Sequence, residues 1–329
     1  MRIAFTHNLQ INLLSEEEAE FDSPRTVMAI TEALRKLGHE VEPLEVSGPA
    51  SRVVARLEAL SPDLVFNTAE GTRGRFREAF FPALLERLGL PFTGSDAYVC
   101  AVTLDKQVTK LLLEHEGVPS PRGKLVLSHD DLGPGELRFP LIVKPNYEGS
   151  SIGISADSVV ETPAALRSRL LESLERYPTG VLVEEFIAGQ DVVVPFLERA
   201  APASHGILEP AGYHFDPLVT RHRKYQVYDY ELKALNFDAV RVKVPAGLPA
   251  EIRERLMKLS EIIFARLGVR DLGRIDFRVT DAGEVYFLEL NALPSLEQGA
   301  SVYLSGALVG LGSMEDVLGC VVESAASRH

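Results

Sequence analysis

Regular alternation between apolar strand patterns and amphipathic helix patterns over residues 1–95 is the strongest constraint on the fold. Strands are predicted at 2–6, 39–44 and 63–67, and helices at 23–37 and 51–60. This alternation is typical of a small parallel α/β domain, in which ligands bind at the carboxyl ends of the strands. His7, Asn8 and the segment 67–75 (NTAEGTRGR) follow two of these strands, so we expect them at the mouth of a binding site.

The stretch 139–155 (FPLIVKPNYEGSSIGIS) predicts a buried strand, a tight glycine–serine loop and a return strand. Gly149 and Gly153 allow positive φ and the close approach of a ligand. Free N–H groups in such a turn suit an anion, most often phosphate, and Lys144 supplies a positive charge nearby. An ordinary hairpin tip with a surface lysine is the alternative interpretation.

The segments GRIDFRV and EVYFLELN predict a hairpin near the C-terminus. If its turn holds two residues, Asp276 faces Glu289 and Arg274 faces Asn291. Two opposed carboxylates repel each other, and Mg²⁺, which prefers carboxylate and amide oxygens together with nucleotide phosphates, removes that repulsion. The guanidinium is suited to stabilising oxyanion charge. The alternative is a solvated polar face with a cross-strand Arg–Asp pair, and a three-residue turn would shift the pairing.

The rest of the chain mixes helices and strands without strict alternation. Helices are predicted at residues 78–88, 99–114, 162–177 and 249–267, and strands at 125–128, 180–186 and 191–197. Residues 216–244 are less regular and contain the basic cluster 221–224 (RHRK). This cluster is either a solvated face or part of a mobile loop that closes on an anionic substrate.

Charge and cysteine content exclude several classes of protein. The 34 basic and 47 acidic side chains give a formal net charge of −13, which argues against nucleic acid and anionic membranes as partners. No apolar run approaches the length of a membrane-spanning helix. Cys100 and Cys320 are the only cysteines, which favours a reducing compartment, so we expect a cytoplasmic protein. The sequence contains neither a P-loop motif nor paired zinc ligands.

Seven short motifs lie between Pro91 and Tyr303, or just beside these residues: LPFTGSD, TLDKQVTK, FPLIVKPNYEGSSIGIS, VLVEEFIAGQDVVV, YDYELKAL, RIDF and ELNALP. Together they resemble the ATP-grasp superfamily and, within it, the D-alanine–D-alanine ligase family. The resemblance implies an α/β fold, α+β in the ATP-grasp part, with an N-terminal parallel α/β domain at residues 1–95. A central ATP-grasp subdomain at 96–184 and a C-terminal one at 185–329 would clamp ATP between them.

The resemblance also implies roles for single residues. ATP would be bound by eight residues: Lys106, Lys144, Glu148, Ser151, Glu184, Phe186, Ile187 and Asp191. Two Mg²⁺ ions, for which Mn²⁺ is a possible substitute, would be bound by Asp276, Glu289 and Asn291. The catalytic residues would be Arg274, which stabilises a tetrahedral intermediate, together with Ser150 and Lys233.

The implied reaction has two steps. A substrate carboxylate attacks the γ-phosphate of ATP to give an acyl phosphate and ADP. An amine then attacks the acyl carbon, which releases phosphate and leaves an amide. Such catalysis rests on positioning and charge neutralisation. The expected partners are small amino-acid or peptide substrates, and the family suggests a homodimer.

The chain departs from the family where substrates bind. An N-terminal glycine pair with an acidic-Val-Ser motif is absent, and NTAEGTRGR replaces a segment that contains histidine in the family. Substrate residues are therefore assigned as Asp22 (with Glu20 as the alternative), Glu70, Tyr225 (with Tyr230 as the alternative), Glu297 and Ser301. These departures favour an amino-acid or peptide ligase of different specificity. D-alanine–D-alanine ligase itself, a non-catalytic nucleotide-binding module and a phosphotransferase are the alternatives.

Overall fold

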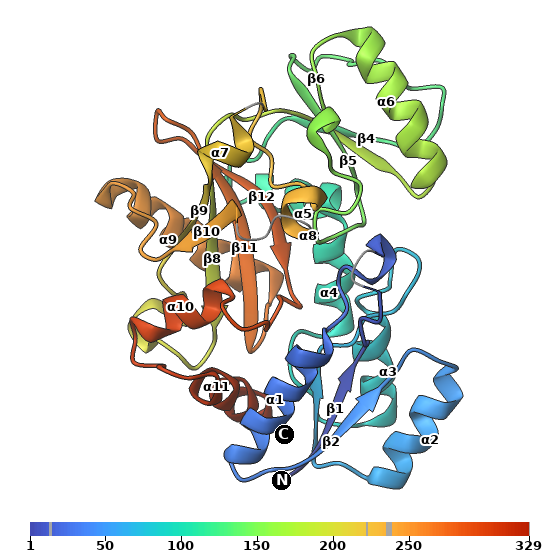
Figure 1. The fold of residues 1–329 in the computed structure, drawn as a ribbon, viewed down its shortest axis with the longest axis vertical. Coiled ribbons are helices and arrows are strands. Elements are labelled where there is room, and N and C mark those ends of the chain that lie inside the picture. The colour runs from blue at the N-terminus through green and yellow to red at the C-terminus, as the bar shows by residue number, and fades with distance from the viewer. Residues whose placement is uncertain (13–14, 222, 235–238, 329) are drawn as a thin grey trace.

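The computed structural model describes residues 1–12, 15–221, 223–234 and 239–328, and three β-sheets organise this part of the chain. Figure 1 shows the N-terminal sheet at one end of the molecule, a four-stranded sheet at the other end, and a five-stranded sheet beside both. The first sheet is parallel and the other two are antiparallel. The predicted mixture of α/β and α+β architecture is therefore confirmed.

The N-terminal sheet has the strand order β2-β1-β3. Its strands are β1 (Arg2–His7), β2 (Glu40–Glu45) and β3 (Leu64–Asn67). Three helices pack on it, α1 on one face and the others on the opposite face: α1 (Pro24–Lys36), α2 (Ala50–Leu60) and α3 (Phe80–Leu88). Ser23 caps α1 as predicted, because its hydroxyl accepts the N–H of Thr26. Pro82 lies in the first turn of α3, where a missing N–H is tolerated.

The four-stranded sheet has the order β4-β7-β5-β6 and carries one long helix. Its elements are β4 (Gly123–Val126), β5 (Leu141–Pro145), β6 (Val159–Val160), α6 (Pro163–Arg176) and β7 (Val181–Glu185). The return strand predicted directly after the glycine–serine loop is wrong. The chain instead turns, since Ile154 N–H donates to Ser151 C=O, passes through the 3-10 helix η2 (Ala156–Ser158), and pairs with β5 only at β6.

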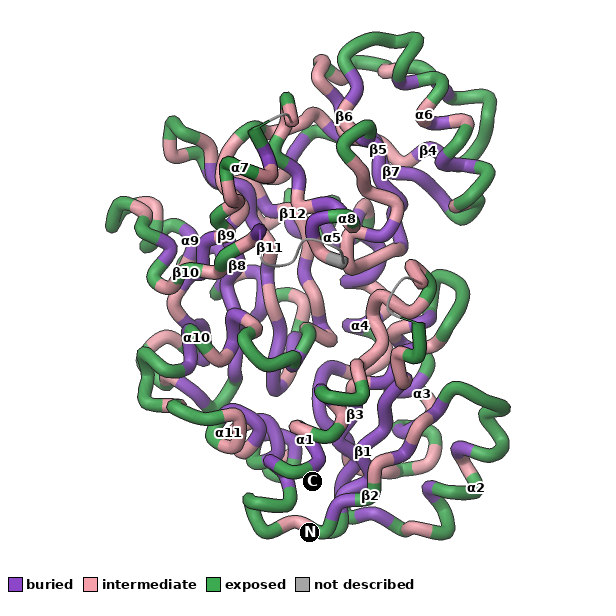
Figure 2. The backbone as a smooth tube through the Cα atoms, viewed as in Figure 1, coloured by how far each residue is buried: buried purple, intermediate pink, exposed green. Residues whose placement is uncertain are grey.

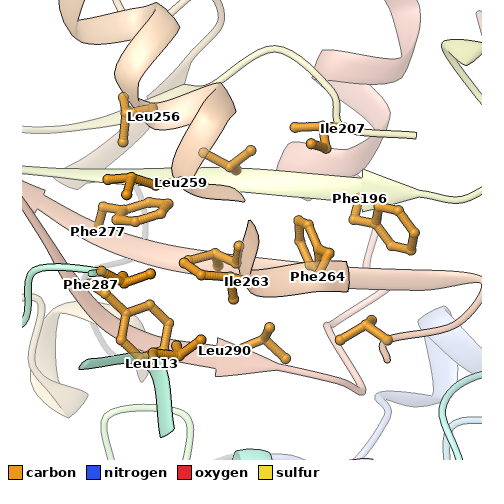
Figure 3. Packing of buried hydrophobic residues seen from close by; sticks show 14 of the residues in the cluster. Leu113, Phe196, Ile207, Leu256, Leu259, Ile263, Phe264, Phe277, Phe287 and Leu290 are labelled. Atoms are coloured by element: carbon orange, nitrogen blue, oxygen red, sulfur yellow. The ribbon is translucent and has the colours of Figure 1, made fainter. Parts of the chain in front are cut away.

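The five-stranded sheet has the order β10-β9-β8-β11-β12, and α9 (Ala250–Leu267) covers one of its faces. Its strands are β8 (Gln190–Leu197), β9 (Ala211–Phe215), β10 (Val240–Lys243), β11 (Leu272–Val279) and β12 (Val285–Asn291). Figure 3 shows Leu256, Leu259 and Ile263 of α9 packed against Phe277 and neighbouring side chains of this sheet. The helical spacing in the sequence predicted this apolar face of α9.

One predicted helix is in fact two. The helix expected at 99–114 is divided into α4 (Ala97–Leu104) and α5 (Lys106–Glu114). Asp105 has an extended backbone between them, and its carboxylate accepts the N–H of Val108 as the cap of α5. Both helices contact β12, so they pack on the five-stranded sheet.

The remaining short elements are η1 (Glu16–Glu18), η3 (Pro202–Ser204), α7 (Pro217–Thr220), α8 (Tyr230–Ala234) and α10 (Ser301–Ala307).

The C-terminal part of the chain returns to the N-terminal sheet. The last helix, α11 (Met314–Ala326), packs on α1 and closes a core shared by the N-terminal and five-stranded sheets. We propose that the three sheets mark three units with bounds near residues 95 and 184, across which α4, α5 and α11 pack.

Burial follows the three sheets. Figure 2 shows buried residues along the strands and exposed residues along the outer faces of α2 and α6. Among the described residues, no helix combines the length and the apolar character needed to cross a membrane.

Candidate active site

A cavity of about 1140 Å³ lies where the three sheets meet. It is lined from the four-stranded sheet by Lys144 and Glu184, from the five-stranded sheet by Asp276 and Glu289, and from the N-terminal sheet by Asn67. The glycine–serine loop and the hairpin, which are far apart in the sequence, therefore face one cavity. Of the nineteen residues predicted for the site, all but Tyr225 line the cavity, and so do the alternatives Glu20 and Tyr230.

The glycine–serine loop uses its residues differently from the prediction. Gly153 has a positive φ of 72° as expected, but Ser150 and Ser151 also have positive φ values, 49° and 61°, whereas Gly149 does not. Gly149 is needed for a close approach instead, since a Cβ atom there would lie 2.1 Å from Oε1 of Glu20. Two consecutive left-handed residues turn successive N–H groups toward one side, which is the geometry of an anion-binding concavity. The hydroxyl of Ser151 donates to Tyr228 C=O at 2.7 Å and ties the loop to the segment before α8.

Two lysines share one buried carboxylate beneath this loop. Lys144 Nζ lies 2.7 Å from Glu184 Oε2, and Lys110 Nζ contacts the other oxygen. Burial raises the pKa of Glu184, but the two lysines outweigh it and the pKa is lowered. Burial lowers the pKa of Lys110 to about 8. Lys110 was not predicted; its position one helical turn after Lys106 on α5 is the signal that could have found it.

Lys106 links the loop to the hairpin. Its Nζ donates to Glu148 C=O at 2.5 Å and lies 3.1 Å from a carboxylate oxygen of Glu289. Burial raises the pKa of Glu289, but Lys106 and Lys144 outweigh it and lower the pKa to about 2. Three lysines thus converge on the side of the cavity where the loop and the hairpin meet.

The hairpin pairing predicted from the sequence is correct at the site. Asp276 pairs with Glu289 and Arg274 pairs with Asn291. The turn is nevertheless one residue longer than assumed, because Val279 pairs with Val285, and a bulge at Leu288 restores the register. The Arg–Asp pair lies within one strand, since Arg274 Nε and Nη2 donate to the two oxygens of Asp276 at 2.7 and 2.8 Å.

The donor set of the hairpin fits a divalent cation. Asp276 and Glu289 are opposed on adjacent strands, and Asn291 places an amide beside them. The buried Nδ2 of Asn291 has no hydrogen-bond partner, so its amide is not committed to a neighbour. Carboxylate and amide oxygens are the ligands that Mg²⁺ prefers.

Another part of the cavity wall is formed by Phe186, Ile187 and Asp191. Burial raises the pKa of Asp191, against the opposing charge of Arg278 at 3.2 Å, and its Oδ2 has no hydrogen-bond partner. The free oxygen of Asp191 could accept a hydrogen bond from a ligand hydroxyl, and the ring of Phe186 could contact a flat base. Tyr225 is placed here rather than with the substrate: its ring packs edge-on against Phe186 with centroids 5.0 Å apart.

The basic cluster is partly buried. The side chain of Arg223 is 6% exposed and pairs with Asp229, which caps α8 by accepting the N–H of Leu232. Lys233 on α8 lines the cavity, and burial, together with the charge of Arg274, lowers its pKa. The prediction of a fully solvated face is therefore wrong for Arg223; His222 lies outside the described residues.

The end of the cavity formed by the N-terminal sheet is acidic. Burial raises the pKa of Asp22 to about 6, and the charge of Glu297 adds to the shift, while Thr68 donates to Asp22 Oδ2 at 2.5 Å. Glu70 is buried, and its N–H donates to Asn8 Oδ1 at 2.7 Å. Ser301, the first residue of α10, and Glu297 line the cavity opposite Asp22.

Comparison with known proteins identifies the family. Residues 131–311 match the family model described as D-ala D-ala ligase C-terminus. The D-alanine–D-alanine ligase of Aquifex aeolicus is 34% identical over 278 residues, which cover 84% of this chain and 86% of that protein. The chain belongs to the D-alanine–D-alanine ligase family. It is thus an ATP-dependent ligase that forms a carbon–nitrogen bond, and the alternative of a non-catalytic nucleotide-binding module is wrong.

Solved structures show the same fold as this ligase. The D-alanine–D-alanine ligase from Bacillus anthracis complexed with ATP has a TM-score of 0.76 at 22% identity, and the match covers 100% of this chain and 98% of that chain. The VanG D-Ala:D-Ser ligase from Enterococcus faecalis has a TM-score of 0.74 at 19% identity, with 98% and 99% covered. The ATP-grasp fold expected from the motifs is confirmed.

Proposed function

We propose that this ligase joins two amino acids, and that its specificity differs from that of D-alanine–D-alanine ligase. The carboxylate of the first amino acid attacks the γ-phosphorus of ATP and ADP leaves. The amine of the second amino acid then attacks the acyl carbon, phosphate leaves, and an amide remains. The observation that carries this proposal is the position of the glycine–serine loop between the lysines and the acidic end of the cavity.

ATP binding follows from the two ends of this arrangement. Phe186, Ile187 and Asp191 would receive the adenosine, with Glu184 beside them. Lys106, Lys144 and the loop N–H groups would receive the phosphates, because they supply the positive charge and the free donors that a triphosphate requires. Glu148 and Ser151 would hold the loop in place over the phosphates.

Asp276, Glu289 and Asn291 would hold two Mg²⁺ ions, which neutralise charge on the transferred phosphate when bound. Arg274 would face the oxyanion of the tetrahedral intermediate, since its guanidinium is already oriented by Asp276. Ser150 would donate to the reacting carboxylate, and Lys233 would lower the negative charge around it.

The acidic end of the cavity would receive the ammonium groups of the substrates. Glu20, Asp22, Glu70 and Glu297 lie there, and Asp22 makes no ion pair among the described residues. An unpaired buried carboxylate is costly, and a substrate ammonium group removes that cost. Ser301 would bind the carboxylate of the second amino acid.

D-alanine–D-alanine ligation is the second candidate. It is favoured by the relatives at 31–34% identity that carry that name, including the enzyme of Marinomonas. It is opposed by the replacement of the histidine-containing segment by NTAEGTRGR and by the concentration of carboxylates at the substrate end.

A substrate panel tests both candidates. ADP release from MgATP would be followed with D- and L-amino acids, alone and in pairs, and products would be identified by mass spectrometry. A mixed or non-alanine dipeptide formed one-to-one with ADP supports the proposal. D-alanyl-D-alanine as the main product supports the second candidate. Formation of AMP, or no ADP with any pair, contradicts both.

We also propose a cytoplasmic homodimer. Four large apolar side chains on the adjacent helices α4 and α5 are exposed: Tyr98, Val108, Leu111 and Leu112. Burial of such a patch against a second copy would remove it from water. Light scattering should give twice the chain mass of 36.1 kDa, and the mass of a single chain would contradict the proposal.

A further inference from the structure

Arg77 is a buried cation that sequence reasoning did not single out. It lies just before α3, and its side chain is 6% exposed. Its guanidinium lies 2.8 Å from Glu20, 3.1 Å from Glu70 and 3.6 Å from each of Glu78 and Glu148. One guanidinium therefore serves four carboxylates.

The four carboxylates come from four separate segments. Glu20 follows η1, Glu70 follows β3, Glu78 precedes α3, and Glu148 belongs to the glycine–serine loop of the four-stranded sheet. All four line the cavity, whereas Arg77 does not. Arg77 thus connects the N-terminal unit to the loop from behind the cavity wall.

Without Arg77 the four carboxylates would repel one another. Carboxylate oxygens of Glu20, Glu70 and Glu78 all lie within 4.8 Å of one another. Burial raises the pKa of Glu78 to about 7 and that of Glu70 well above its ordinary value, while Arg77 acts in the opposite direction on both. Arg77 is therefore the group that favours their ionised forms and holds them together.

Glu20 also fixes the loop. Its Oε1 occupies the space that a side chain at Gly149 would need, next to Ser150 and Ser151. Arg77 pairs with Glu20, which lies against the loop, and with Glu148, which is part of the loop. A shift of the guanidinium would therefore move both carboxylates and, with them, the backbone N–H groups of the loop.

We propose that Arg77 is a positioning residue for the reaction: it holds Glu20 and Glu70 at the substrate end of the cavity and locks the glycine–serine loop against the N-terminal unit. The inference rests on the proposed function for the substrate that these carboxylates receive, which is an amino acid bearing an ammonium group. It assigns no direct contact between Arg77 and the substrate.

Arg77→Met tests this positioning, with Arg73→Met as the matched control because Arg73 is exposed in the same loop. For Arg77→Met, we expect at least a 10-fold rise in KM for the amino acid that gives most ADP in the panel. KM for ATP should rise less, because Lys106 and Lys144 keep their own carboxylate partners. The wild-type preference for that amino acid over the same acid lacking the amine should shrink at least fivefold. A merely structural defect would not change this preference.

Hydrogen exchange provides a readout that does not depend on turnover. In Arg77→Met, exchange in residues 147–153 should rise at least fivefold, while α9 and the Arg73→Met control stay unchanged. The inference is overturned if Arg77→Met folds and the exchange rate of its loop is unchanged. It is also overturned if Arg77→Met is active and its KM for the amino acid is unchanged. Should Arg77→Met fail to fold, the same measurements on Arg77→Lys decide. If the wild-type protein shows no ligase activity but loop exchange still rises in Arg77→Met, the proposed function is contradicted. The role of Arg77 in holding the loop is then still supported.

Discussion

Lys144 Nζ lies 2.7 Å from Glu184 Oε2, while Lys110 contacts the other oxygen of the same carboxylate, which is 1% exposed. The strand β7, which comes just before Phe186 and Ile187, is thus joined to the strand β5, which carries Lys144, by a buried charge cluster. The two strands are neighbours in one sheet, where Ile142 pairs with Glu184 and Val143 with Val183. The two ends of the proposed nucleotide site are therefore held by one sheet.

Glu184→Gln should destabilise the protein and weaken ATP binding. The change leaves two buried lysines without their counter-ion, and breaking such a cluster costs about 3–5 kcal/mol. Urea unfolding would measure this loss, and KM for ATP should rise. Glu175→Gln, at an exposed position on α6, is the control and should change neither quantity. Wild-type stability of Glu184→Gln would show that the lysines find other partners.

Asp276→Asn should stop turnover without unfolding the protein. If Asp276 binds metal as proposed, its loss removes charge stabilisation worth several kcal/mol, which lowers kcat by about 10³-fold. Chelation by EDTA should stop the wild-type enzyme, and added Mg²⁺ should restore it. The control is Asp281→Asn in the exposed turn of the same hairpin. Activity of Asp276→Asn near the wild-type level would rule out this metal site.

Asp22→Asn should stabilise the protein near neutral pH and not in acid. The pKa of Asp22 is about 6 in the folded protein against an ordinary 3.8, so the folded state binds more protons than the unfolded state between these values. The contribution of Asp22 to the free energy of unfolding therefore falls as the pH rises from about 4 to about 6. Asparagine does not ionise, so the variant does not lose this stability. With some contact to solvent, we expect a gain of about 1–2 kcal/mol at pH 7.5. Urea unfolding at pH 4.5 and 7.5 checks it; an equal effect at both pH values contradicts the assignment.

Arg223→Ala should lower turnover more than ATP binding. The change leaves Asp229 buried without its cation and loosens the cap of α8, which carries Lys233. A displacement of about 1 Å at a reacting group can cost up to about 10²-fold in rate. The ratio of dipeptide to ADP should fall, because water reaches the acyl phosphate. Arg221→Ala, at an exposed position two residues earlier, should leave the ratio unchanged.

Local patterns in the sequence were sufficient to predict the two faces of the cavity. An assumed two-residue turn placed Asp276 opposite Glu289, and the pairing is correct only because a bulge at Leu288 offsets the longer turn. Ser23 and the spacing of apolar residues along α9 were likewise local signals.

Features that depend on distant partners were not predicted. Arg77 lies in a turn before α3 and Lys110 lies within α5, and only the fold shows which carboxylates surround them. The strands β9 and β10 are short, and β9 begins with Ala211 and Gly212, which have little strand preference. β9 is paired with β8, and among the described residues β10 is paired only with β9. Tyr225, with Tyr230 as the alternative, was assigned to the substrate in place of the tyrosine that the family has after the loop lysine. The ring of Tyr225 instead packs on Phe186, whereas Tyr230 lines the cavity.

The separate cores have a mechanical consequence. The N-terminal and five-stranded sheets share one apolar cluster through Phe5, Leu34, Leu272 and α11, whereas the four-stranded sheet packs only with α6 and its own loops in the clusters formed by the described residues. Its contacts with the rest of the protein include the hydrogen bond from Ser151 to Tyr228 and the ion pairs of Glu148 with Arg77 and of Glu184 with Lys110.

The four-stranded sheet with α6 should therefore rotate as one body relative to the rest of the protein when nucleotide binds. Small-angle scattering profiles should differ with and without nucleotide, and identical profiles would contradict this rotation. Opening the cavity by such a rotation exchanges polar contacts for water and exposes little apolar surface. The ligase can thus release its nucleotide without partly unfolding.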